Sequence, residues 1–436
     1  MSDHTPRQRQ IPSTPGTDHR PDHHDTNHIS PDSLESLQHR PPRRPTSAAA
    51  FALYSFSSQW FLVPQGTGII AVILHQLPYQ FPGLGILSTI VWLYTIAVFA
   101  TCLALYSLRI VLYPRHVVHQ LRHSILETSC LASISIALTS ITQMLALTVV
   151  RQWGDRWGLV AFALWCLNTA LAVLAVLGIP YVYVQVQPPG LKAVPPATLL
   201  PLIAALTSAA GAGVLCRYAA LSPRLQVPMI IVSYLEIGIG IPLATCLETV
   251  YLARLFDQAF PDQTQVYQTM ILCGPFGQGS FALQILGQAV QRGSFAAYDR
   301  GTFLTAGAAP IVALCSQFAG LLSWGFSTFW WSFALLSISH TLLAQPGGWR
   351  MTKFSMGAWS LVFPWGVYTN AAVMLGKIMN SPAFDVWCTV LAILLVLIAL
   401  NNHIWTIRGL IQGTIFGLEK GWKFHDELAD IDEREK

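Results

Sequence analysis

The residues of this chain best suited to chemistry lie in one eight-residue stretch, Gly-Pro-Phe-Gly-Gln-Gly-Ser-Phe, inside an otherwise apolar run. Gly and Pro weaken a helix interior by about 1 and about 3 kcal/mol relative to Ala. At bilayer depth, irregular backbone is tolerated only where it is buried in protein or lines a water-filled cavity. The stretch therefore predicts one wall of a transport path, with the Gln278 amide contacting the cargo. The candidate wall residues are Gly274, Pro275, Gly277, Gln278 and Gly279.

Two similar interruptions occur elsewhere in apolar runs. One contains Gly66, Thr67 and Gly68, and the other contains Pro364, Thr369 and Asn370, with Phe363 directly before the proline. Interior Pro and Gly kink helices and free backbone groups. The N-terminus of a half-helix presents partial positive charge, which suits an anion. Three interruptions together predict a path for anions, although one alone is more typical of close helix packing.

Composition places the protein in the lipid bilayer. Of 436 residues, 53% are hydrophobic and 11% are charged, and the mean hydropathy is +0.48. Soluble domains carry about 25% charged residues. The net charge of +4 gives no indication of nucleic acid as a partner. The eight cysteines lie in apolar segments, so no disulfide framework is expected. The chain lacks nucleotide-binding, zinc-protease and nucleophile-elbow motifs, so we expect no enzyme, no cofactor and no metal.

Apolar runs of about 20 residues predict membrane-spanning helices. We predict an all-α protein with ten spans: 60–77, 84–111, 125–150, 157–184, 195–219, 226–254, 265–290, 304–343, 355–378 and 383–411. The eighth run is long for one span, which leaves three alternatives: an interfacial stretch, a break near Gly320 to Gly325, or eleven spans. We expect residues 1–46 to form a disordered tail, residues 56–416 the transporter domain, and residues 417–436 a charged tail.

Charge placement predicts the topology. With the N-terminus inside, 18 of the Lys and Arg residues fall on the cytoplasmic side and 7 on the other, as the positive-inside rule requires. An even number of spans then places both termini in the cytoplasm. Consecutive spans form five hairpins, in which the odd helices carry the interruptions and line the path and the even helices lie outside.

Ionisable residues inside the spans are candidates for function. Glu127 and Glu236 are expected either to take part in proton coupling or to form ion pairs. His116, His119 and His123 share one helix face in a basic cytoplasmic segment, for which contact with anionic lipid is the favoured interpretation. The histidines of the N-terminal tail are expected to be solvated.

The interruptions, taken in order, resemble the tellurite-resistance/dicarboxylate transporter family. That family includes fungal sulfite efflux pumps, malate transporters and plant slow anion channels, and the likeness to the sulfite pumps is greatest. The residues that carry the resemblance are Trp60-Phe61, Gly66-Thr67-Gly68-Ile69, Leu77-Pro78-Tyr79, Gly274 to Gly279, Leu286-Gly287, Trp324-Gly325-Phe326, Trp330-Trp331, Phe363 to Thr369 and Leu375-Gly376-Lys377.

The resemblance implies five helical hairpins around a central pore, a pore gate at Phe363 and a homotrimer in the plasma membrane. It favours sulfite export. The alternatives are a C4-dicarboxylate (malate) carrier, an anion channel gated by Phe363, and an exporter linked to fungal secondary metabolism. Three features depart from the sulfite-pump pattern: Pro64-Gln65 before the first glycine, Glu127 to Cys130 in place of a kinked third helix, and Ser280 where glycine is common. They put the substrate in question more than the fold.

Overall fold

The computed structural model describes residues 45, 47–186, 190, 194–258, 265–344 and 354–416. Within these residues the chain is helical throughout, apart from short turns and one isolated bridge between Arg300 and Leu304. The all-α prediction is therefore confirmed. The predicted tails, 1–46 and 417–436, lie outside the described residues except for Pro45.

Seven helical segments are long and apolar enough to cross a membrane in the described part of the chain. They are Leu84–Leu112, Ile125–Trp153, Asp155–Gln185, Pro196–Tyr218, Pro223–Asp257, Ala308–Leu343 and Pro382–Gln412. In the second and fourth of these, 78% and 100% of the most apolar window is buried, against 22–33% in the other five. A largely exposed apolar helix is suited to lipid, so the segments separate into an inner and an outer class.

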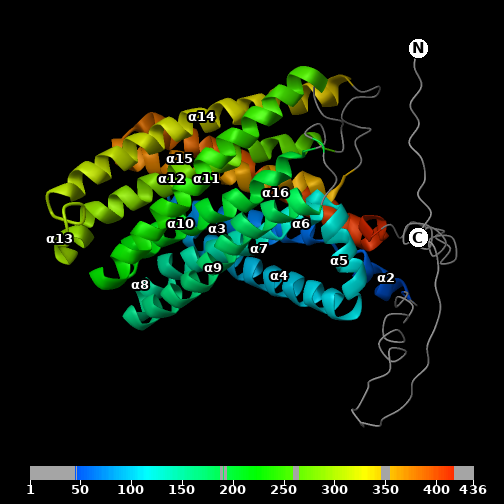
Figure 1. The fold of residues 1–436 in the computed structure, drawn as a ribbon, viewed down its shortest axis with the longest axis horizontal. Helices are drawn as coiled ribbons and strands as arrows, with labels where there is room; N and C mark the ends of the chain where they lie inside the picture. Colours follow the sequence, from blue (N-terminus) through cyan, green and yellow to red (C-terminus); the bar gives the residue numbers. More distant parts are fainter. Residues whose placement is uncertain are drawn as a thin grey trace, which may run out of the picture. The chain divides into compact units, whose positions relative to one another are not determined.

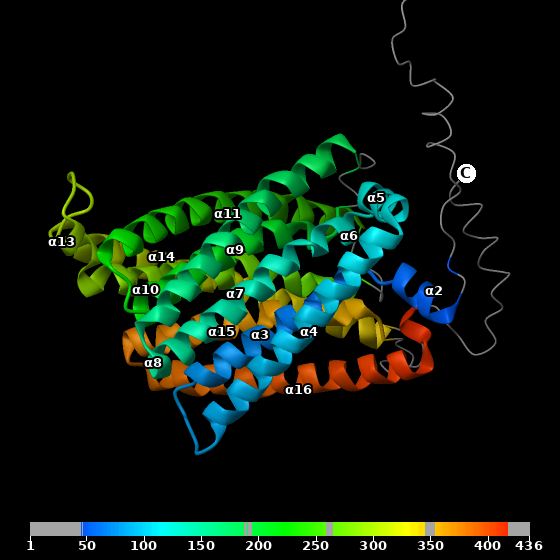
Figure 2. The same ribbon diagram turned by 90° about the horizontal axis from the view of Figure 1, so that it is seen from below.

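Five inner helices pack against one another in a closed sequence of neighbours, here called the inner ring: α3, α7, α10, α12, α15 and back to α3. They are α3 (Leu62–Gln76), α7 (Ala132–Leu147), α10 (Leu200–Tyr218), α12 (Gly274–Ala289) and α15 (Val362–Met379). Each packs against the long helix that follows it in the chain. These outer helices are α4 (Leu84–Leu112), α9 (Asp155–Gln185), α11 (Pro223–Gln258), α14 (Ala308–Ala344) and α16 (Pro382–Gln412). Figures 1 and 2 show the long helices running lengthwise side by side.

Four inner helices begin with a 3₁₀ segment, which passes directly into the α-helix. The segments are η1 (Ser58–Phe61), η3 (Pro196–Leu199), η4 (Val266–Cys273) and η7 (Met356–Leu361). Each following α-helix has a proline within its first three residues: Pro64, Pro201, Pro275 and Pro364. Proline is tolerated in the first turn because its missing N–H would have no α-helical partner there. The expected mid-helix kinks at these prolines are therefore replaced by 3₁₀-to-α junctions. Prolines well inside a helix occur instead in α9 and α11 of the outer layer.

The third inner helix reaches a similar interruption without proline. α6 (Ile125–Cys130) ends at Cys130, and α7 begins at Ala132 after the single residue Leu131. The hydroxyls of Thr128 and Ser129 donate to the backbone carbonyls of Ser124 and Ile125, at 3.2 and 2.6 Å. Such side-chain bonds compete with the helical ladder and bend helices. In this helix, two hydroxyl residues, Thr128 and Ser129, occupy the position where the sulfite-pump pattern has a kink.

The long eighth run forms one helix. α14 is continuous from Ala308 to Ala344, with no break between Gly320 and Gly325. A side chain at Gly320 would meet the Gln284 side chain at 2.8 Å and the Ser280 carbonyl at 3.1 Å, so this glycine allows α14 to approach α12 closely. The alternative of a break at this point is therefore wrong.

The shorter elements gather at the two ends of the long helices. In Figures 1 and 2, α8 (Val149–Trp153) and α13 (Phe295–Tyr298) lie at the left end. The other end, on the right, holds α2 (Ala48–Tyr54), α5 (Pro114–His123) and α6. The remaining short elements are η5 (Val290–Ser294), which is a π-helix after α12, and η8 (Thr414–Phe416) after α16.

The three histidines of α5, which were expected to share one helix face, stack on different partners. His119 and His123 stack on each other with ring centroids 4.2 Å apart, while His116 stacks on Tyr54 of α2 at 3.7 Å. Burial, with Arg109 close by, lowers the pKa of His116 from 6.5 to about 4. A histidine that stays neutral in the folded state contributes stability above its unfolded pKa, and that contribution is lost as the pH falls from 6.5 toward 4.

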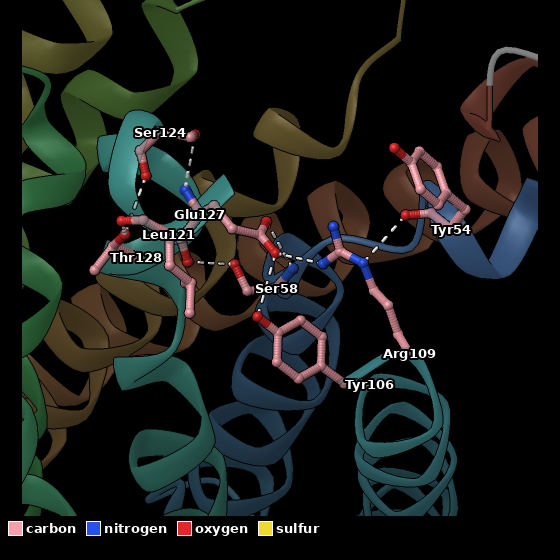
Figure 3. Close-up of polar contacts among 8 residues, drawn as sticks. All are labelled: Tyr54, Ser58, Tyr106, Arg109, Leu121, Ser124, Glu127 and Thr128. Carbon is pink, nitrogen blue, oxygen red and sulfur yellow. Dashed lines mark hydrogen bonds and ion pairs between the residues drawn. The ribbon is translucent and has the colours of Figure 1, made fainter. Parts of the chain in front are cut away.

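A buried ion pair joins the start of the inner ring to α4 and α6 (Figure 3). Arg109 of α4 donates to the Glu127 carboxylate of α6 at 2.6 Å, and both side chains are at least 94% buried. The same carboxylate accepts from the backbone N–H of Ser58 at 3.0 Å and from the Tyr106 hydroxyl at 3.3 Å. Arg109 also donates from Nε to the carbonyl of Tyr54 at 3.1 Å. Glu127, expected to be either a proton carrier or an ion-pair partner, thus forms an ion pair.

Removing one charge of this pair should destabilise the protein strongly. Glu127→Gln leaves the Arg109 guanidinium buried without its counter-ion, a change that costs about 3–5 kcal/mol. We expect a clearly lower thermal unfolding temperature for the detergent-purified protein, measured by tryptophan fluorescence. The double variant Arg109→Met/Glu127→Leu should recover much of the loss. Equal stability of Glu127→Gln and wild type would show that the pair contributes little.

Candidate functional site

The glycines of the Gly274 stretch face neighbouring helices. A Cβ atom at Gly274 would lie 2.8 Å from the Ile203 side chain of α10. At Gly277 it would lie 3.0 Å from the backbone nitrogen of Tyr368 in α15. At Gly279 it would lie 2.9 Å from Ile241 of α11. Real Cβ contacts are rarely this short, so the missing side chains let α12 approach three helices at once.

The glycines of α3 and α15 form a reciprocal contact. A Cβ at Gly66 would meet Val362 at 3.0 Å, and one at Gly366 would meet Ile69 at 2.6 Å. Gly68 faces α7, where a Cβ would lie 2.7 Å from Ser140. These residues hold α3 between its two neighbours in the inner ring.

The hydroxyls of the two candidate threonines, Thr67 and Thr369, form hydrogen bonds within the protein. The Thr67 hydroxyl lies 2.8 Å from that of Thr95, on the outer helix α4. The Thr369 hydroxyl donates to the carbonyl of Trp365 in its own helix at 2.9 Å. Thr67 is therefore turned toward the outer layer, and the Thr369 hydroxyl satisfies its bond locally.

The expected half-helix N-termini also have partners. The backbone N–H of Gly274 donates to the carbonyl of Ile271, and that of Val362 donates to Trp359. The 3₁₀ segments pass directly into α12 and α15, so these two N–H groups are already hydrogen-bonded and are not free to bind an anion.

Phe363 and Asn370 share one face of α15, because residues seven apart lie two turns apart on the same side of a helix. The other faces of α15 are occupied. Gly366 faces α3, the Tyr368 ring stacks on Trp324 of α14 at 5.1 Å, and Trp365 donates to the carbonyl of Leu391 in α16 at 3.1 Å. The remaining face, with Phe363 and Asn370, is buried, and it is flanked by the contact of Gly366 with Ile69 of α3 and by that of Pro364 with Gly274 of α12.

Gln278 lies on a corresponding face of α12. Ser280 donates to the carbonyl of Gly320 in α14 at 2.6 Å, and Gln284 donates to the Ser280 hydroxyl at 2.7 Å, which marks the face toward the outer layer. Gln278 is four residues after Gly274 and therefore shares its face, where a Cβ at Gly274 would lie 2.8 Å from Ile203 of α10 and 3.7 Å from Pro364 of α15. This face lies away from the Ser280 side of the helix. It is buried, and its Oε1 atom has no hydrogen-bond partner among the described residues.

Two further amides, Gln65 and Gln76 of α3, extend this polar set and were not among the predicted site residues. They occupy the face left by Gly66, Thr67 and Gly68, which contact α15, α4 and α7. Both are buried, and Gln65 Oε1 and both amide atoms of Gln76 lack partners within the described chain. The signal in the sequence was an amide eleven residues after another in an apolar helix, since three turns of helix return to the same face.

The shared property of these positions is an unsatisfied amide. Asn370 is fully buried, and neither Nδ2 nor Oδ1 has a partner among the described residues. A buried polar group without a partner costs about 1–3 kcal/mol, so such groups mark places where water or a ligand completes the bonding. Three adjacent members of the inner ring, α3, α15 and α12, thus each supply an uncharged amide with an unpartnered atom, which is the oxygen in Gln65 and Gln278 and both the nitrogen and the oxygen in Asn370. Amide side chains can turn by 180° to present either atom.

The carboxylates lie apart from these amides. Glu127 is held by Arg109 at the end of the helices near α2. Glu236 and Glu248 lie on the outer helix α11, and their carboxylate oxygens are buried without partners in the described structure. No group of three His, Cys, Asp or Glu residues that could hold a metal ion occurs in the part of the chain described here.

Comparison with known proteins identifies the relatives of this arrangement. The family model described as voltage-dependent anion channel matches residues 55–407. The sulfite efflux pumps SSU1 of Arthroderma benhamiae and Trichophyton rubrum are each 29% identical over 342 residues, which is 78% of this chain and 87% of each pump. The malic acid transport protein of Schizosaccharomyces pombe is 21% identical over 344 residues, covering 79% of this chain and 76% of that protein.

Gly277 should be the position where an added methyl group disturbs the inner ring most clearly. Gly277→Ala places Cβ against the backbone of Tyr368, which cannot move aside as a flexible side chain could, so α12 and α15 must separate. We expect a loss of about 1–3 kcal/mol, seen as a lower unfolding temperature. The control is Gly325→Ala on α14, where nothing lies within 4 Å and alanine favours the helix. Equal unfolding temperatures for the two variants would contradict the packing role.

Proposed function

The chain belongs to the voltage-dependent anion channel family, and on this premise we propose that it exports sulfite or a closely similar small anion across the plasma membrane. The observation that carries the proposal is a set of buried amides on neighbouring inner helices, in which Oε1 of Gln65, Oε1 of Gln278 and both amide atoms of Asn370 have no partner among the described residues. Amide N–H groups replace part of the water shell of an anion without binding it as tightly as a fixed charge would.

The names of the relatives support the choice of sulfite. Both sulfite pumps match this chain at higher identity than the malic acid transport protein does. A dicarboxylate has two separated charges, and Arg or Lys side chains are the usual partners of carboxylates. The amide-bearing faces of α3, α12 and α15 carry no Arg or Lys at the depth of these amides. Malate therefore stays the second candidate.

In this proposal the inner ring lines the path. Phe363 obstructs it, and Asn370 receives the anion two helical turns further along α15. The ring of Phe363 is large, uncharged and buried, so an anion cannot pass without losing water or displacing the ring. Gly66, Gly68, Gly274, Gly277 and Gly279 keep the walls close enough for the amides to converge.

The topology of the proposal follows from the sequence. The inner helices α3, α12 and α15 cross together with the seven longer segments, which gives ten crossings and places both termini in the cytoplasm. The charge asymmetry of the connecting segments supports this orientation. A homotrimer is the assembly that the family resemblance implies.

Shortening Phe363 should open the path. We expect Phe363→Ala to raise anion flux in proteoliposomes tenfold or more, because the obstacle is removed. Core Phe→Ala changes cost about 3–5 kcal/mol, so Phe363→Leu provides a milder second variant with a smaller rise. Phe329→Ala is the control, since Phe329 is on the outer helix α14 and is 48% exposed. Unchanged flux through correctly folded Phe363 variants would exclude this gate.

Sulfite tolerance tests the function directly. A fungal strain that lacks its own sulfite exporter should grow at higher sulfite concentrations when it expresses this chain, and sulfite should appear faster in the medium. Asn370→Ala should reduce the gain at equal protein abundance. Unchanged tolerance with the protein present at the plasma membrane would remove sulfite as the substrate. Uptake of labelled malate into proteoliposomes, without sulfite transport, would favour the dicarboxylate alternative.

A further inference from the structure

A polar cavity of about 500 Å³ is lined by residues at the C-terminal ends of α10, α12 and α15 and by residues of η5. Figures 1 and 2 show α13, which directly follows η5, at the same end of the molecule as α8. Three basic residues and three glutamines line most of it: Arg217, Arg292, Lys377, Gln288, Gln291 and Gln317. No acidic residue is among the lining residues. We call this space the mouth cavity.

The mouth cavity lies at the ends of inner helices. Arg217 is in the last turn of α10, Gln288 is in the last turn of α12, and Lys377 is in the last turn of α15. These are three consecutive members of the inner ring. The cavity is therefore built partly from the ends of the helices that form the inner ring.

Basic residues at helix C-termini have a structural use, because they offset the negative end of the helix dipole. Arg292 serves this use, since it donates to the backbone carbonyl of Arg217 at the end of α10. Arg217 and Lys377 differ. No hydrogen bond to a carbonyl is found for either side chain in the described residues, Lys377 is exposed, and the Arg217 guanidinium lies 5.4 Å from the Tyr218 ring centre.

Unsatisfied polar atoms mark the same cavity. Arg217 Nε and Gln288 Oε1 are buried and have no hydrogen-bond partner in the described part of the chain. The carboxylate of Asp385 in α16 packs against Gly376, one residue before Lys377. Asp385 does not line the cavity. The positive charges that face the hollow are therefore not balanced by a lining acid.

The connecting segments at this end are positively charged as a whole. All of them lie within the described residues, and they contain seven Lys or Arg residues and three Asp residues. Clefts lined by one sign of charge focus the field and raise the local concentration of ions of opposite sign. The amide-lined interior has no such charge, so recruitment and passage are separated along the axis of the ring.

We propose that the mouth cavity is an anion-binding vestibule, in which Arg217 and Lys377 hold a small oxyanion with its water shell before or after it crosses the inner ring. The guanidinium of Arg217 offers paired N–H donors that match an oxyanion, and the ammonium of Lys377 adds a point charge. The inference rests on the proposed function, and it adds a binding site outside the gate.

The test uses full-length protein in phosphatidylcholine vesicles, where no anionic headgroup competes for the site. Equilibrium exchange of labelled sulfite is measured over a range of concentrations and ionic strengths, because exchange does not depend on the orientation of the protein. We expect Arg217→Gln and Lys377→Gln each to raise the half-saturating sulfite concentration three- to tenfold. The maximal rate should change less than twofold, and the dependence on ionic strength should weaken. Arg156→Gln, at the same end but outside the cavity, should match wild type.

The outcomes separate this inference from the proposed function. Wild-type exchange with unaltered half-saturation and salt dependence in both variants would overturn the vestibule and leave sulfite transport standing. If wild type exchanges no sulfite, the proposed function fails, and calorimetric titration of purified protein with sulfite decides the vestibule alone. Binding that weakens at least threefold in both variants supports it, and binding that is absent or unchanged overturns it. Thermal unfolding of each variant checks that the fold is retained.

Discussion

The close approach of the inner helices is the constraint on which the rest of this structure depends. Within a bilayer, backbone polar groups must be satisfied inside each segment, and association between helices relies on packing. Here the packing is reciprocal: Gly66 receives Val362 while Gly366 receives Ile69, so each helix supplies the hollow that its neighbour fills. Gly277 brings α12 against the backbone of Tyr368 in the same way. Larger residues at these positions would widen the inner ring and part the amides.

Two kinds of polar chemistry are kept apart in the molecule. Arg109 and Glu127 neutralise each other in the interior, Arg217 and Lys377 lie at the ends of the helices, and the buried carboxylates of Glu236 and Glu248 lie on the outer helix α11. The interior faces carry amides alone. This division is physically sensible for a transported anion, since a fixed cation deep in a low-dielectric path would bind the ion too strongly to release it.

The sequence predicted the helices well, but it predicted less well which neighbour each face of a helix contacts. The Gly and Pro interruptions correctly separated α3, α12 and α15 from the apolar outer helices, because small residues mark close helix contacts. The same residues suggested kinks, yet Pro275 and Pro364 lie in first turns after 3₁₀ segments, and only the backbone reveals where a helix changes type.

The directions of several side chains could not be predicted from the sequence. Thr67 is turned toward Thr95, which depends on the position of α4. Gln65, although noted, had no assigned role because an isolated amide does not show which neighbour it faces. Lys377 entered only through the family motif and the charge count, and Arg217 only through the charge count, since a cavity exists only after distant helix ends meet.

The 3₁₀ segments at the beginning of the inner helices increase the length that these helices span. A 3₁₀ segment rises about 2.0 Å per residue against about 1.5 Å in an α-helix. The eight residues of η4 therefore extend about 16 Å, where an α-helix of equal length would extend about 12 Å. The interrupted helices gain length without gaining residues, and so keep pace with the longer outer helices beside them. Conversion of such a segment to α-helix would shorten it by several ångströms and rotate everything beyond it, so η4 and η7 couple the length of a helix to the direction in which its side chains face.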